Sequence, residues 1–264
     1  MEKREKRQLI VVSVVFILYV LIILSANIFM RLSESDGNET FEMISGILFG
    51  FIGIPIFSII IPIWLSKKWR LDFSFWPKTK NLLLVISVLA VFTILVNFES
   101  IKTIIQLKIS IKDFGIHYVS TLLFHVTYYP LFVLFIFPVL RKNFGLKLSL
   151  VITALAFALY HLAQFHFYPA GTTLFVQIYL FSYFIASLLF YLWSESLILV
   201  ALVHQTTGAL AVAANGSIHS EIDFLFYLTI PIIVILFGYM VIQAIKNKNR
   251  MELNSNWWLK IYYE

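Results

Sequence analysis

The sequence contains no cysteine and carries very little charge. Only 14 of its 264 residues are Asp or Glu, and charged residues of both signs make up 13% of the chain. A soluble domain carries about 25% charged residues, so this composition excludes an ordinary water-soluble protein. Without cysteine the chain forms no disulfide, no thiolate metal site and no cysteine nucleophile.

Apolar and aromatic residues take the place of the missing charge. Hydrophobic residues make up 60% of the chain, 26 residues are Phe, and the mean hydropathy is +0.89. A membrane-spanning helix needs about 20 mostly apolar residues, and eight runs of the sequence meet this need. They cover residues 9–30, 42–65, 80–98, 116–140, 147–168, 172–193, 195–214 and 223–245. We therefore predict an all-α, polytopic membrane protein with eight transmembrane helices in one bundle, a single membrane domain over residues 1–264.

Basic residues fall mainly on one side of this predicted topology. If the N-terminus is cytoplasmic, sixteen of the 20 Lys and Arg residues lie in cytoplasmic segments. Cytoplasmic loops of membrane proteins carry an excess of Lys and Arg, so both termini are expected in the cytoplasm. Residues 101–113 are expected to lie on the outer surface. The abundance of Ile, Lys and Asn favours a bacterial cytoplasmic membrane. The expected partners are membrane lipids and not nucleic acid, because the net charge of +6 reports orientation in the membrane.

The few polar residues inside the predicted spans are the candidates for function, because such groups are costly in lipid. They are His125, Tyr128 and Tyr129 in the fourth run, His161 and Gln164 in the fifth, and His204, Gln205, Thr206 and Thr207 in the seventh. No acidic residue lies in a span core, and the nearest, Glu195, starts the seventh run. By helical rise, Tyr128, His161 and His204 lie roughly 14–21 Å from the inner boundary, which would allow one central cavity. A neutral histidine in a helical bundle is equally explained by an interhelical hydrogen bond.

The sequence around these residues contains three ordered motifs. Phe137-Pro138-Val139-Leu140-Arg141-Lys142-Asn143-Phe144-Gly145 follows the first candidates, Phe157 precedes His161 by four residues, and Ser196-Leu197 begins eight residues before His204. Over about residues 120–215 the chain thus resembles the CAAX-protease and bacteriocin-processing family, also called the Abi or lysostaphin-resistance-like family. The resemblance implies an eight-helix intramembrane fold, with His161 and His204 as inherited catalytic positions.

Four positions of the family pattern carry other residue types. Tyr128 and Tyr129 stand where the family has paired glutamates, Val133 stands for its arginine, and Gly208 stands for its asparagine. In the family the first glutamate is thought to activate water, while the histidines and the asparagine stabilise the oxyanion. A tyrosine, with an ordinary pKa near 10, is a poor base at neutral pH, and losing a general base costs about 10²–10⁴-fold in rate. The resemblance therefore implies a pseudoprotease without a cofactor. It would bind a membrane or envelope protein, a lipid or a peptide in the former substrate cavity, in a scaffolding or bacteriocin self-immunity role.

Two other interpretations stay open. His125, His161 and His204 come from three predicted helices, and three histidines with an open fourth position can hold catalytic zinc, which would make the chain an active intramembrane endopeptidase. Against it stand the missing His-Glu-x-x-His motif and the missing nearby carboxylate. A transporter or channel component is the third interpretation, although no inverted repeat is visible in the sequence.

Overall fold

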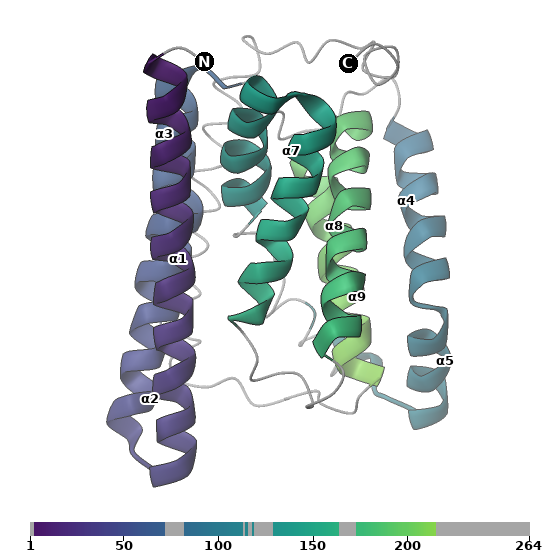
Figure 1. Ribbon diagram of the computed structural model, residues 1–264. Coiled ribbons are helices and arrows are strands. Elements are labelled where there is room, and N and C mark those ends of the chain that lie inside the picture. The colour runs from purple at the N-terminus through teal and green to yellow at the C-terminus, as the bar shows by residue number, and fades with distance from the viewer. Residues whose placement is uncertain are drawn as a thin grey trace. The chain divides into compact units, whose positions relative to one another are not determined.

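A computed structural model describes residues 3–71, 82–112, 114–115, 118, 129–163 and 173–214. All regular secondary structure within these residues is helical (Figure 1). The chain forms two compact units. Unit 1 contains the described residues 3–71, 130–163 and 173–189, and unit 2 contains the described residues between 82 and 129 together with 190–214.

Unit 1 begins with two long antiparallel helical rods (Figure 1). The first rod is α1 (Lys3–Asp36), and the second is formed without a break by α2 (Glu39–Gly46), η1 (Ile47–Ile60) and α3 (Ile61–Trp69). The turn between the rods is closed by hydrogen bonds at both sides, since the Gly37 amide donates to the Ser33 carbonyl and the Asn38 side chain caps α2 by accepting from the Thr40 amide. The rods contain the predicted runs 9–30 and 42–65.

Two segments of unit 1 are wound as π-helices, η1 and η3 (Pro130–Ile136). A proline lies inside η1 at position 55 and another opens η3 at position 130. Proline removes a backbone donor and clashes with the preceding turn of an α-helix, so both prolines lie where the chain departs from α-helical geometry. Gly53 in η1 lets the two rods approach closely, because a Cβ added there would lie only 3.2 Å from the Ile23 side chain.

The helix α7 (Phe137–Leu162) continues η3 but is divided at Gly145. The backbone of Gly145 has φ 75° and ψ 177°, a combination open essentially only to glycine. Figure 1 shows the chain turning back at the upper end of α7, so the two halves run antiparallel. This break coincides with the polar gap predicted between the runs 116–140 and 147–168. The helix α8 (Thr173–Ser194) follows and matches the run 172–193.

Unit 2 contains α4 (Leu82–Val96), α5 (Phe98–Leu107) and α9 (Leu197–Ala214). Helices α4 and α5 are separated by Asn97 and bend there by 66°. The predicted run 80–98 corresponds to α4, which at 15 residues is too short to cross a bilayer unaided. Helix α9 corresponds to the run 195–214.

The protein has the character of a membrane protein. Among the described residues, four helical elements are long and apolar enough to cross a membrane, or five if α4 and α5 together form one span. One of the four, Pro130–Leu162, is the element that Gly145 divides. The run 223–245 lies outside the described residues, so the number of eight spans and the orientation stay predictions.

Candidate functional site

His161 lies near the end of α7 in unit 1 and is held by its own helix. Its Nδ1 lies 2.8 Å from the Phe157 carbonyl oxygen, four residues earlier. A carbonyl can only accept, so Nδ1 carries the proton of this hydrogen bond. The side chain is buried, with the Phe157 ring at 4.3 Å and the edge of Tyr160 at 4.9 Å between centroids.

Phe157 is the centre of an aromatic cluster in unit 1. Its ring stacks on Phe184 of α8 at 3.9 Å and meets Phe132 of η3 edge-on at 5.3 Å. Next to this cluster, Tyr160 stacks on Tyr19 of α1 at 5.2 Å. The spacing of Phe157 and His161 therefore has a structural explanation, because Phe157 packs three helices together while its carbonyl fixes the tautomer of His161.

His204 lies in the middle of α9 in unit 2 and faces Tyr129. The two rings meet nearly edge-on, with centroids 5.5 Å apart and planes at 71°. Tyr129 is fully buried and His204 is 8% exposed. Tyr129 stands at one of the two positions where the family pattern has glutamate, so an aromatic ring occupies that place against the histidine.

The three residues after His204 bind three different groups of unit 2. The Gln205 amide donates to the Tyr118 carbonyl oxygen at 2.9 Å, Thr206 and the Tyr118 hydroxyl share a hydrogen bond of 2.9 Å, and Asn97 donates to the Thr207 hydroxyl at 3.2 Å. Four consecutive side chains of an α-helix point in four directions, so this polar segment, His204–Thr207, has neighbours around most of the helix. The contacts attach α9 to the α4–α5 bend and to residue 118.

Tyr118 and Asn97 are the polar residues that sequence reasoning missed. Asn97 is buried at the α4–α5 bend and also donates to the Thr93 carbonyl. An asparagine at the end of an apolar run is the signal that could have identified it, because a buried amide needs partners. No comparable signal marks Tyr118 among 13 tyrosines.

The start of α9 explains the Ser-Leu part of the motif. The Ser196 hydroxyl accepts from the Leu199 amide as an N-cap, and the Leu197 side chain is fully buried. Glu195 precedes this cap with a left-handed backbone, φ 52°, and its side chain is buried. It precedes His204 by nine residues, roughly 14 Å of helical rise.

Of the other predicted site residues, two lie in the described part of the chain and three lie outside it. Val133 is buried in η3 of unit 1, and Gly208 is half-buried on α9, one turn beyond His204. His125, Tyr128 and Gln164 lie outside the described residues. His161 belongs to unit 1 and His204 to unit 2, so their predicted convergence on one cavity stays a prediction. Within the described part of the chain, no three His, Asp or Glu side chains are grouped as a metal site would require.

Comparisons of this chain with protein-family models, with curated proteins and with solved structures gave no match. The likeness to the CAAX-protease family therefore depends on the motif residues alone.

Proposed function

We propose that this chain is a non-catalytic member of the CAAX-protease-like family that binds another membrane or envelope protein, or a peptide, within the bilayer. The main observation in support is the packing of Tyr129, whose fully buried ring lies against His204. Tyr129 stands at a position where the family has a carboxylate. Hydrolysis in that family needs a general base beside the histidines. An aromatic ring in this place supplies packing and no carboxylate to activate a water.

The hydrogen bonds at and next to the two motif histidines support the same proposal. The Nδ1–H of His161 is held by its own helix, and the segment after His204 is occupied in holding α9 to its neighbours. The arginine position of the pattern is a buried valine, Val133. These interactions stabilise a helical bundle, and a helical bundle in lipid offers a surface for a membrane-embedded partner.

The proposal includes the predicted topology of eight spans with both termini in the cytoplasm of a bacterial cell. Within unit 1, the first residues of α1, the end of α3 and the turn of α7 lie at one end, and all three are basic (Figure 1). The α1–α2 turn at the opposite end carries Glu34, Asp36 and Glu39. The excess of Lys and Arg at the first end is what the positive-inside rule expects of a protein whose N-terminus is cytoplasmic.

The test is a comparison of protein termini in membranes of cells that express the chain. New peptide termini are quantified for the original sequence and for the double variant His161→Gln, His204→Gln, with equal amounts of both proteins in the membrane. We expect the two sets of termini to be the same. Termini that appear with the original chain and disappear with the double variant would show histidine-dependent cleavage and would refute the proposal.

The binding half of the proposal needs a separate readout. A photo-crosslinking residue placed at lipid-exposed Ile178 of α8 or Leu159 of α7 should give a discrete crosslinked band in membranes of the native host. The histidine double variant should give the same band, because the proposed binding does not depend on the chemistry of the two imidazoles. Loss of the band in a correctly folded double variant would contradict this.

A further inference from the structure

Three distant segments bring basic residues to the same end of unit 1. Helix α1 begins at this end, α3 finishes there and α7 turns there (Figure 1). The basic residues of the three segments are Lys3, Arg4, Lys6, Arg7, Lys67, Lys68, Arg70, Arg141, Lys142 and Lys147. We call them the basic end. Glu5 is the one acidic residue that the structure describes in these segments, so the net charge of this surface is strongly positive.

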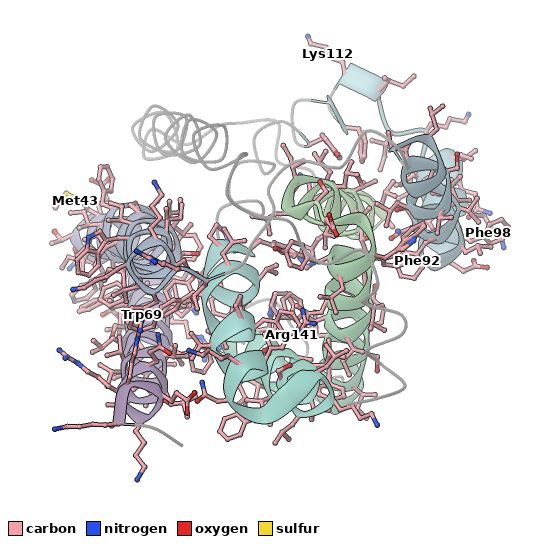
Figure 2. The ribbon with its side chains drawn as sticks, turned by 90° about the horizontal axis from the view of Figure 1, so that it is seen from above. Met43, Trp69, Phe92, Phe98, Lys112 and Arg141 are labelled. Atoms are coloured by element: carbon pink, nitrogen blue, oxygen red, sulfur yellow. The ribbon has the colours of Figure 1, made fainter. Side chains whose placement is uncertain are left out.

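Aromatic residues lie beside these cations. The Lys68 ammonium lies 4.8 Å from the ring centre of Trp64, and Trp69 stacks on Phe135 of η3 at 5.5 Å. Trp64 is more than half exposed. Figure 2, seen from this end, shows Trp69 on α3 and Arg141 on α7. Exposed tryptophan next to lysine is typical of the boundary between hydrocarbon and headgroups.

The backbone that carries the cations is fixed by specific bonds. Arg70 closes α3 in a left-handed conformation, with its amide donating to Lys67 and the next amide donating to Ser66. The Ser66 hydroxyl donates to the Leu134 carbonyl at 2.7 Å, which attaches α3 to η3. The α7 turn is set by Gly145 and by the Asn143 amide, which donates to the Val139 carbonyl. The basic end is therefore preorganised, and preorganised groups lose less entropy on binding than those of a loose tail.

We infer that the basic end is a docking surface for the anionic phospholipid headgroups of the adjoining leaflet. The charge, the tryptophans at the hydrocarbon boundary and the fixed backbone all fit a phosphate-bearing lipid whose acyl chains lie along the helices. Each lysine or arginine at an anionic surface contributes roughly fivefold in affinity. This surface is independent of the proposed loss of catalysis, since it uses none of the motif histidines.

The test measures which lipids surround the full chain in reconstituted vesicles. Brominated phosphatidylglycerol and brominated phosphatidylcholine are each titrated into plain phosphatidylcholine, and quenching of tryptophan fluorescence reports the lipid next to the protein. We expect the anionic lipid to quench at several times lower mole fraction, and salt to reduce the difference by screening. Equal quenching by the two lipids would overturn the inference.

Matched variants locate the effect. The triple variant Lys67→Gln, Lys68→Gln, Arg70→Gln should remove most of the preference. The variant Lys102→Gln, Lys108→Gln, Lys112→Gln, which removes three cations from unit 2, should leave it within about twofold. The variant Lys67→Arg, Lys68→Arg should keep the preference. If the first triple variant does not fold, Arg141→Gln, Lys142→Gln replaces it. An equal loss in the basic-end and unit 2 variants would contradict a localised surface. Abolition of the preference by inorganic phosphate at constant ionic strength would identify a free-phosphate site instead.

Discussion

The two units of this protein hold their helices together in different ways. Unit 1 uses rings: Tyr19 stacks on Tyr160, and Phe157 contacts both Phe132 and Phe184. Unit 2 uses hydrogen bonds that join Gln205, Thr206 and Thr207 of α9 to Tyr118 and Asn97. Apolar burial does little to drive helices together in lipid, because the acyl chains are equally apolar. Tight packing and polar contacts are the remaining sources of stability. Among the described residues both units contain both kinds of contact, since Ser66 joins α3 to η3 in unit 1 and Phe92 packs on Phe190 in unit 2. Ring stacking is more prominent in unit 1, and side-chain hydrogen bonds to α9 are more prominent in unit 2.

The comparison also explains what became of the motif positions. In unit 1 the motif pair Phe157 and His161 is joined to the aromatic packing, and in unit 2 His204 is joined to Tyr129 beside the hydrogen-bonded segment. Each histidine therefore takes part in the contacts that stabilise its own unit. The proposed loss of catalysis agrees with this use.

The largest expected effect comes from breaking the ring packing of unit 1. Phe157→Ala removes a fully buried ring that contacts two other helices, and should lower the free energy of unfolding by about 3–5 kcal/mol. Thermal or denaturant unfolding in detergent measures it. Phe144→Ala is the control, because that ring is 43% exposed on the same helix. Similar losses for the two variants would contradict the aromatic-core account.

The next effect concerns the turn of α7. Gly145→Ala places a side chain at φ 75°, with no atom within 4 Å to clash, so the cost is purely conformational. We expect a loss of about 1–3 kcal/mol. Gly115→Ala in unit 2 is the control, since its Cβ would also meet nothing within 4 Å and its backbone shows no positive φ. Equal stability of both variants would show that the chain does not need this turn.

The elements of the fold differ in how far the sequence predicts them. The long apolar runs within α1 and the second rod, and the break near Gly145, are predictable because each depends on local hydropathy or on one glycine. The sequence does not predict the bend at Asn97 or the π-helical winding of η1 and η3, since neither proline nor asparagine fixes the geometry that follows it. Nor does it predict that α1 continues to Asp36, six residues beyond its apolar run.

The candidate site is predictable in its residue types and less so in their contacts. Helical spacing alone places Phe157 beside His161, and the Ser196 cap follows from local rules. The partners of α9 are not predictable in this way, because Tyr118 and Asn97 are distant in sequence and meet α9 only through the fold. The assignment of His161 and His204 to separate units likewise needs tertiary structure.

A smaller effect is expected from breaking the hydrogen bonds of unit 2. Gln205→Leu removes the bond to the Tyr118 carbonyl, and should cost about 0.6–1.7 kcal/mol, the range measured for polar contacts between membrane helices. A double-mutant cycle between Asn97→Leu and Thr207→Val isolates one such contact. Coupling near zero in that cycle would mean that unit 2, like unit 1, depends on packing.

The smallest effect is expected at His204 itself. His204→Phe keeps an aromatic ring against Tyr129 and should change the free energy of unfolding by less than about 1.5 kcal/mol. The crosslinked band at Ile178 should also persist in this variant. A correctly folded variant that loses the band would show that the imidazole has a chemical role.

The most direct test of the central claim, that His161 and His204 are structural, is nitrogen-15 NMR of the histidine side chains before and after zinc is added. Single His→Gln variants assign the signals. The account predicts a proton on Nδ1 of His161, and His161 and His204 signals that zinc leaves unchanged. A zinc-dependent shift of both His161 and His204, with stoichiometric metal retained after dialysis, would contradict it and would favour a catalytic zinc site.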